Sequence, residues 1–402
     1  MKQTCKRCVL HTAIPGITLD QEGICPVCRK YDSLKDHEPR LKQYLTEEME
    51  QLFASVKKKN LPYDAIVLFS GGKDSTLLLK MAKEKYKLRP LAFAVMHPLV
   101  NDVASQNMDR VAAALNIDLI KYSVDQEVYR KVMGYGIRHA PEYGLGEFFG
   151  CDICSFFHSW IPVKYAIKLG IPVILEGSDS SQTGEISYGQ GGKVQSDVSK
   201  GLKPFGRLHD LVIDALGQSY RGSIYDFDAD EIVKGFYPSV ISPFTFLPYD
   251  FRKNFHELDK IGLEAKKFRS IYTNCSATPF FSYFSIKRYD CVSYIKHYAT
   301  EVRNGYPNLM QLSIDGEEQS TGLNKDLVER MMEEYKNVVL HVVENRLRRE
   351  TVDETGKEAM RRLAPNYIRV FGQDVCDVLL DDVLRIAQHA DYFGVDLENI
   401  GG

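Results

Sequence analysis

A run of small and polar residues at positions 70–76, Ser-Gly-Gly-Lys-Asp-Ser-Thr, has the composition of a phosphate-binding turn. Gly71 and Gly72 can adopt positive φ, which lets backbone N–H groups approach an anion. Lys73 adds a positive charge, although the spacing is not that of a Walker A loop. The run also offers three hydroxyl side chains, Ser70, Ser75 and Thr76. The alternative is an ordinary strand-to-helix turn in which Asp74 caps the helix.

Four cysteines near the N-terminus form two Cys-x-x-Cys pairs. The pairs are Cys5 with Cys8 and Cys25 with Cys28. Two such pairs are typical of a tetrahedral zinc site with four thiolate ligands. Zinc would supply the folding free energy that residues 1–31 cannot obtain from burial alone. We therefore predict a structural zinc site, the alternative being four buried free cysteines.

A second cysteine pair, Cys151 and Cys154, precedes His158 and the segment WIPVKYAIKLG. This segment is expected to be helical, with Pro162 in its first turns. The dipole at a helix N-terminus favours the thiolate, which lowers the pKa of a cysteine placed there. We expect a nucleophile or metal ligands at this pair. The alternative is two core cysteines that lie one helical turn apart.

Short apolar runs indicate the elements that position these residues. AIVLF, LAFAV, DLIKY and PVILEG have the character of buried strands, and helix-like segments separate the first three. This alternation predicts an α/β fold with a doubly wound, mainly parallel sheet. The glycine turn follows the first run. Ligands of such sheets bind at the carboxyl ends of the strands.

The chain of 402 residues divides into four expected segments. They are a zinc-binding module at 1–31, a linker helix at 32–60, the wound α/β domain at 61–265 and a mainly helical C-terminal region at 266–402. The helical region begins where strand-like runs stop and amphipathic segments such as DLVERMMEEYKNVVLHVVENRLRRE take over.

The composition excludes several classes of protein. Hydrophobic residues make up 44% and charged residues 26%, which is ordinary for a globular protein. Neither a signal-peptide core nor an apolar stretch of about 18 residues occurs, so we expect a cytoplasmic protein without a membrane segment.

A net charge of -3 gives no sign of nucleic-acid binding, without excluding a local basic patch. Nine cysteines in such a chain favour metal or thiol chemistry. A homo-oligomer is compatible with the sequence.

In its context between a strand and a helix, SGGKDS resembles the PP-loop of the N-type ATP pyrophosphatases, a superfamily with an HUP-like α/β fold. The resemblance covers roughly residues 61–265. It implies that the loop binds the β,γ-pyrophosphate of ATP together with Mg²⁺, with Lys73 and Asp74 in catalytic roles. A substrate oxygen then attacks the α-phosphate, pyrophosphate leaves, and a nucleophile displaces AMP.

The same resemblance assigns roles to two other strand ends. It places Phe93–Met96 near the adenine and the segment Glu176-Gly177-Ser178-Asp179 near the phosphates. The carboxylates of Glu176 and Asp179 would then serve Mg²⁺, with Asp179 the stronger candidate. Acidic residues that follow strands are also common turn formers, which is the alternative here.

The order of CKRCVL, PGITLD and EGICPVC ahead of the PP-loop is most similar to the N-acetyl sugar amidotransferases of bacterial surface-polysaccharide pathways. Zinc-carrying tRNA thiolases are less similar. The amidotransferase resemblance implies that the acetamido oxygen of a sugar-linked substrate is adenylated. Ammonia from a partner protein such as a glutaminase then displaces AMP and leaves an acetamidino group.

Two alternatives stay open. One is thiolation of a tRNA base or a small-molecule amide, with a donor protein delivering sulfur to Cys151 and Cys154; these two and Cys275 would hold an iron–sulfur cluster or carry the sulfur. The other is a non-catalytic scaffold that senses nucleotide and binds zinc. The C-terminal region does not resemble the amidotransferase pattern, so the acceptor is undetermined.

Overall fold

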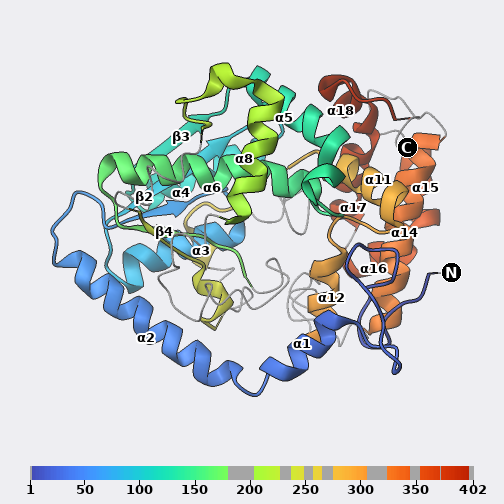
Figure 1. Cartoon of the computed structure of the whole chain (residues 1–402), viewed down its shortest axis with the longest axis horizontal. Helices are drawn as coiled ribbons and strands as arrows, with labels where there is room; N and C mark the ends of the chain where they lie inside the picture. The colour runs from blue at the N-terminus through green and yellow to red at the C-terminus, as the bar shows by residue number, and fades with distance from the viewer. Residues whose placement is uncertain are drawn as a thin grey trace. The chain divides into compact units, whose positions relative to one another are not determined.

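The computed structural model describes residues 2–179, 203–226, 237–248, 257–264, 275–305, 324–344, 354–371 and 373–397 (Figure 1). The chain divides into two compact units. The first comprises Met1–Asp36, Ala140–Phe149 and Lys267–Gly402, and the second comprises His37–His139 and Gly150–Lys266. The domain boundary expected between residues 265 and 266 lies outside the described residues.

The second unit contains a five-stranded sheet. Its strands are β1 (Ala65–Leu68), β2 (Pro90–Met96), β3 (Leu119–Ser123), β4 (Val173–Leu175) and β5 (Ser239–Ile241). They lie in the order β3-β2-β1-β4-β5, and every neighbouring pair is parallel. The four apolar runs are confirmed as β1 to β4, and the α/β fold class is confirmed with them. The sequence did not reveal β5, because its three residues begin with a serine and lie between Pro238 and Pro243, outside any longer apolar run.

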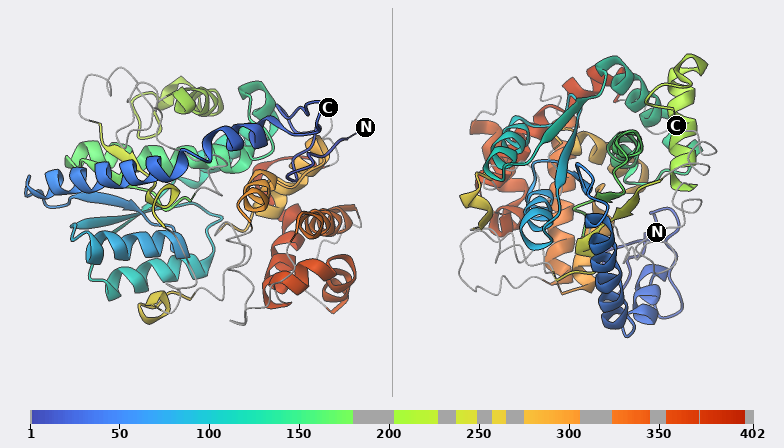
Figure 2. Two further views of the ribbon diagram at one scale, coloured as in Figure 1. Left: turned by 90° about the horizontal axis from the view of Figure 1, so that it is seen from below. Right: turned by 90° about the vertical axis from the view of Figure 1, so that its left-hand side faces the viewer.

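The winding of the sheet reverses between β1 and β4. Ile66 of β1 pairs with Leu91 of β2 on one side and with Ile174 of β4 on the other. Helices α3 and α4 cover one face of the sheet and α6 covers the other (Figure 2). The C-terminal ends of β1 and β4 therefore flank the topological switch point, where ligands of wound sheets bind.

The helices of the second unit pack their apolar faces on this sheet and on each other. They are α2 (Glu38–Lys57), α3 (Lys73–Lys80), α4 (Asp102–Ala114), α5 (Gln126–His139), α6 (Phe149–Leu169), whose first residue belongs to the other unit, and α8 (Lys203–Leu216). A π-helical turn, Met81–Lys85, continues α3, and short 3-10 turns lie at Gln218–Tyr220 and Pro243–Thr245. In α2 the buried stripe consists of Leu45, Met49, Phe53 and Val56.

The first unit joins the cysteine-rich N-terminus to a helical region. Its helices are α1 (Pro26–Leu34), the 3-10 turn Ala140–Tyr143, α11 (Thr278–Tyr289), α12 (Ile295–Arg303), α14 (Lys325–Glu344), α15 (Glu354–Leu363), α16 (Pro365–Phe371), α17 (Gln373–Leu384) and α18 (Ile386–Phe393). Every residue of α11 from Thr278 to Ile286 is buried, so this helix forms the centre of the region. The helical C-terminal region is confirmed. Among the described helices, none combines the length and the apolar character that crossing a bilayer requires.

Candidate functional site

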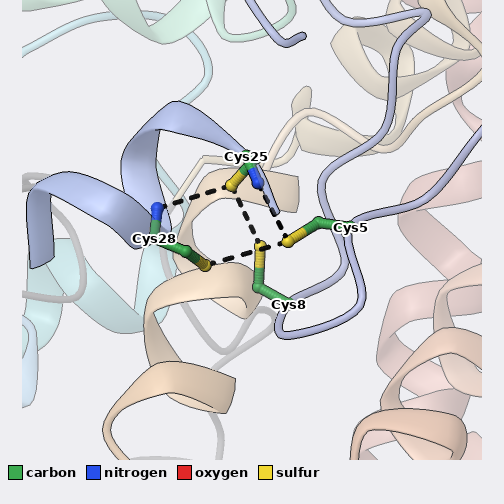
Figure 3. A group of neighbouring side chains, drawn as sticks. All are labelled: Cys5, Cys8, Cys25 and Cys28. Carbon is green, nitrogen blue, oxygen red and sulfur yellow. Dashed lines mark hydrogen bonds between the residues drawn. The ribbon is translucent and has the colours of Figure 1, made fainter. Parts of the chain in front are cut away.

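The four N-terminal cysteines converge as predicted (Figure 3). All four are completely buried, and their sulfur atoms lie within 4.8 Å of one another. The Sγ atoms of Cys5 and Cys28 are 3.9 Å apart, and those of Cys8 and Cys25 are 3.7 Å apart. Zinc–sulfur bonds of about 2.3 Å in a tetrahedron place the sulfurs about 3.8 Å apart. The donor set and its size therefore fit a zinc ion.

Backbone N–H groups surround these sulfurs. The amide of Cys25 donates to Sγ of Cys5 at 3.3 Å and the amide of Cys28 donates to Sγ of Cys25 at 3.4 Å (Figure 3). The amide of Arg7 also donates to Sγ of Cys5, at 3.4 Å. Hydrogen bonds from Cys28 and Cys8 lower the pKa of the Cys25 thiol. Such donors favour the thiolate and orient it toward a cation. The local chain is thus organised to hold a metal, with Cys25 also capping the N-terminus of α1.

In the second unit, the glycine turn links β1 directly to α3. Gly71 has a φ of +69°, and a Cβ atom there would lie 2.2 Å from the carbonyl oxygen of Ala104 in α4. No other residue type fits this position without moving the backbone. Gly72 instead has an extended conformation, φ -87° and ψ 172°, and precedes the first residue of α3, Lys73. Positive φ, which both glycines could adopt, is used only by Gly71.

The hydroxyl groups of the turn bond mainly within it. Oγ of Ser75 accepts from the amide of Ser70 at 3.3 Å, lies 3.1 Å from Oγ of Ser70 and donates to the carbonyl of Gly72 at 3.2 Å. Ser75 therefore closes the loop, while Ser70 is exposed. The hydroxyl of Thr76 is fully buried and has no hydrogen-bond partner among the described residues. The hydroxyl of Thr76 therefore does not face solvent.

Lys73 and Asp74 form an ion pair at the start of α3. Nζ of Lys73 lies 2.6 Å from Oδ1 of Asp74, and both side chains are largely shielded, at 15% and 17% exposure. The pair places one cation and one carboxylate at the end of a helix whose free N–H groups favour anions. A phosphate that binds Lys73 would compete with Asp74 for it, which leaves the carboxylate available to a metal ion.

The segment after β4 lies against the first turn of α3. A Cβ atom on Gly177 would be 3.0 Å from the amide nitrogen of Ser75 and 3.1 Å from its Cα. The carboxylate of Glu176 accepts hydrogen bonds from the hydroxyls of Ser178 at 3.1 Å and Ser242 at 3.3 Å. Asp179 is buried. The tertiary structure therefore brings the two segments that follow β1 and β4 into direct contact.

Asn107 of α4 is a site residue that sequence reasoning missed. It is fully buried, and its Nδ2 donates to the carbonyl oxygen of Gly71 at 3.2 Å. Its Oδ1 accepts from Arg110 at 2.8 Å and from the amide of Glu264 at 3.1 Å. In the sequence, Asn107 could have been recognised as an amide side chain on the apolar stripe of an amphipathic helix. A buried polar residue at such a position needs hydrogen-bond partners.

The second cysteine pair lies on α6, which begins earlier than expected. Cys151 and Cys154 occupy its first two turns, and Pro162 lies inside the helix rather than near its start. Burial raises the pKa of the Cys154 thiol to about 11. The lowered pKa expected from the helix dipole is therefore wrong for Cys154, because desolvation disfavours its thiolate more strongly. Cys275 is partly buried in the first unit, and the three-cysteine cluster stays a prediction.

Cys154 instead lies with two histidines of the same unit. His97 follows β2, His158 lies one turn after Cys154 on α6, and one ligand atom from each of the three lies within 4.8 Å of the others. The rings of His97 and His158 meet edge to face, with centroids 5.4 Å apart. Burial lowers the pKa of His158 to about 4 and lowers that of His97 well below its usual value. The sequence signals were a histidine directly after a strand and the Cys154-x-x-x-His158 spacing.

These features define a doubly wound α/β unit with a glycine turn at its switch point, in one chain with a four-cysteine site. No protein-family model matches the chain. It is 34% identical over 116 residues to the uncharacterized protein MJ1599 of Methanocaldococcus jannaschii, a match that covers 29% of this chain and 41% of that protein. The chain thus spans less than half of this relative's length.

A solved structure is also similar, the U34-tRNA thiolase NcsA from Methanococcus maripaludis with its 4Fe-4S cluster. The match covers 77% of this chain and 89% of that one, at 15% sequence identity and a TM-score of 0.33. A score this low supports no conclusion about the fold or the function of this chain.

Proposed function

We propose that this chain is an ATP-dependent enzyme that adenylates a carbonyl or amide oxygen of its substrate and releases pyrophosphate. The observation that carries the proposal is the contact between Gly177, after β4, and the first turn of α3, after β1. Gly177, which lacks a Cβ atom, meets the backbone of Ser75 there at the switch point of a parallel sheet, beside a helix N-terminus. This combination is suited to a polyphosphate.

The proposed roles follow from the positions of the side chains. The turn at residues 70–76 would hold the β- and γ-phosphates, with Lys73 neutralising charge as it accumulates on the leaving pyrophosphate. The carboxylates near the turn would bind the Mg²⁺ ion that accompanies ATP, since Mg²⁺ prefers oxygen ligands. These carboxylates are Asp74, Glu176 and Asp179. The two hydroxyl donors on Glu176 keep its carboxylate oriented.

The proposed reaction has two displacements. The substrate oxygen forms a bond to the α-phosphorus of ATP, and the bond from that phosphorus to the bridging oxygen breaks, so pyrophosphate leaves with the electron pair. A nucleophile then adds to the activated carbon, and AMP leaves when the carbon–oxygen bond breaks. With ammonia, which loses protons, an acetamido group becomes an acetamidino group. The nitrogen donor would be a partner such as a glutaminase, and the acceptor a sugar-linked small molecule.

Thiolation is the second candidate. The observation that favours it is Cys154, held with His97 and His158 in the same unit as the glycine turn. Hydrosulfide would replace ammonia in the second displacement: its sulfur bonds to the activated carbon, AMP leaves and a proton is lost. The first step would be unchanged. The raised pKa of Cys154 means that this thiol would need a metal or a base before it could act as a thiolate.

Binding of ATP tests the nucleotide site that amidotransfer and thiolation would share, and it requires no knowledge of the acceptor. We expect Lys73→Ala to weaken the binding of ATP with Mg²⁺ at least about tenfold in isothermal titration calorimetry, a loss of about 1.4 kcal/mol. Lys80→Ala is the matched control, because Lys80 lies at the far end of α3 and pairs with Glu84. Equal ATP affinity in the Lys73 variant and the wild type would refute the proposed site.

The second step is tested by the product. Purified chain, ATP and N-acetyl sugar nucleotides are incubated with ammonium or with sulfide, and mass spectrometry distinguishes nitrogen from sulfur in place of oxygen. Amidotransfer predicts a nitrogen product with ammonium, whereas thiolation predicts a sulfur product. ATP binding without substrate-dependent pyrophosphate release, across acceptors that include tRNA, would favour the non-catalytic scaffold.

A further inference from the structure

We propose that His97, Cys154 and His158 form a second metal site, which binds one zinc ion and is separate from the four-cysteine site. All three residues belong to the second unit. The four-cysteine site lies within the first 28 residues, which belong to the first unit. The proposal concerns metal binding alone and does not depend on the proposed reaction.

The geometry is close to that of a bound zinc ion. The three ligand atoms lie within 4.8 Å of one another. Zinc bonds of about 2.0 to 2.3 Å in a tetrahedron require separations of about 3.3 to 3.8 Å. A closure of at most about 1.5 Å, within reach of side-chain rotations, would therefore complete the set. Cys154 and His158 are four residues apart on α6, which places them on one face of the helix.

The donor set selects the kind of metal. Two imidazoles and one thiolate suit zinc and exclude Mg²⁺ and Ca²⁺, which need oxygen ligands. Nδ1 of His97 accepts a hydrogen bond from the amide of Leu99 at 3.2 Å, so this nitrogen is unprotonated and must exchange that bond for the metal when zinc binds. The carboxyl end of β2 holds this ring next to α6. His158 needs only to keep its present position on the helix.

Tyr129 of α5 supports two of the three ligands. Its ring stacks on His97, with centroids 4.9 Å apart and planes within 8°, and its hydroxyl lies 3.6 Å from Sγ of Cys154. A residue that packs on one ligand and hydrogen-bonds to another fixes both, which is how surrounding residues commonly tune metal sites. Tyr129 is therefore a positioning residue for this site.

Among the described residues the site has three protein ligands, whereas a structural zinc site has four. Zinc with three protein ligands keeps a fourth position for water or another small exchangeable ligand. His97 lies directly after β2, at the edge of the sheet where ligands of wound folds bind. The site also differs from the cluster expected at Cys151, Cys154 and Cys275, because it uses the two histidines and does not use Cys151.

Metal analysis of the full-length chain, purified anaerobically with zinc in the medium, tests the proposal. We expect the wild type to hold one more equivalent of zinc than His97→Gln, Cys154→Ser or His158→Gln. Cys151→Ser, one turn earlier on the same helix, is the matched control and keeps the wild-type content. Tyr129→Phe should keep the site but weaken zinc binding about tenfold. Equal zinc content in the wild type and the His158 variant would overturn the proposal.

Cobalt provides a readout that does not depend on the variants folding. The wild type is treated with a mild chelator, which empties a three-ligand site before a four-thiolate site, and is then titrated with Co²⁺. We expect one equivalent to bind, with the charge-transfer absorption of a single thiolate. Failure to bind Co²⁺ would overturn the proposal. So would iron and sulfide in the purified chain that are lost in Cys151→Ser as fully as in Cys154→Ser.

Discussion

The side-chain amide of Asn107 donates a hydrogen bond of 3.2 Å to the carbonyl oxygen of Gly71. Gly71 is the residue of the glycine turn with positive φ, and Asn107 reaches it from the buried face of α4. The same helix supplies the carbonyl of Ala104 that fills the space beside Gly71. The conformation of the turn is therefore determined partly by a helix that follows the next strand of the sheet.

Asn107→Asp is expected to weaken ATP binding, because it disturbs the glycine turn more than it destabilises the rest of the unit. The substitution keeps an acceptor for Arg110 and for the Glu264 amide but replaces the donor to Gly71 with a carboxylate oxygen. A buried carbonyl left without its donor costs about 1 to 3 kcal/mol. Titration calorimetry with ATP and Mg²⁺ would measure a loss of about five- to tenfold in affinity. Wild-type affinity in this variant would show that Asn107 does not position the turn.

Gly71→Ala is expected to be far more destabilising than Gly170→Ala. Both glycines have positive φ, at +69° and +66°, so both variants incur the cost of about 1 to 2 kcal/mol for a left-handed alanine. Only at Gly71 does the added Cβ meet backbone, whereas Gly170 has no atom within 4 Å. Urea denaturation should give a larger loss of unfolding free energy for Gly71→Ala by about 2 kcal/mol or more. Equal losses would contradict the close contact with Ala104.

Gly177→Ala is expected to disturb the nucleotide site. It adds no strain from a left-handed backbone, because the φ of Gly177 is not positive. Its Cβ would lie 3.0 Å from the amide nitrogen of Ser75, so the first turn of α3 must move by a few tenths of an ångström. We expect a several-fold loss of ATP affinity together with a fall of about 1 kcal/mol in the unfolding free energy. Gly206→Ala on α8, where no atom lies within 4 Å, is the control. If Gly177→Ala bound ATP with unchanged affinity, the segment after β4 would not be part of the phosphate site.

Removal of metal from the four-cysteine site is expected to unfold the N-terminal module. The segment also buries Val9, Leu10, Ile14, Ile17 and Ile24, but so short a segment cannot fold on apolar burial alone. Its folding therefore depends on the binding free energy of the metal. A strong chelator, or Cys8→Ser, should make the segment before α1 sensitive to limited proteolysis, while the α/β unit keeps its resistance. Cys376→Ala is the control, because Cys376 is a buried cysteine of α17 that does not belong to the four-cysteine group. Protease resistance that survives complete metal loss would show that the module folds without metal.

Local patterns in the sequence were sufficient for several features. The Cys-x-x-Cys spacing predicted the four-cysteine site, since each pair forms a tight turn and four thiols favour one cation. The apolar runs predicted β1 to β4, because a strand that is buried on both faces needs continuous apolar residues. The glycine turn was recognisable because small residues between a strand and a helix leave backbone groups free for an anion.

The tertiary structure alone decided which of these features meet. β1 and β4 are neighbours although more than a hundred residues separate them, and this pairing brings Gly177 against Ser75. The depth at which a side chain lies is also a long-range property, so the raised pKa of Cys154 could not be inferred from its place near a helix start. His97 joins Cys154 and His158 because β2 and α6 pack together, with the rings of Phe93 and Tyr165 4.9 Å apart. Residue spacing records local geometry, whereas strand order and burial depend on contacts across the whole fold.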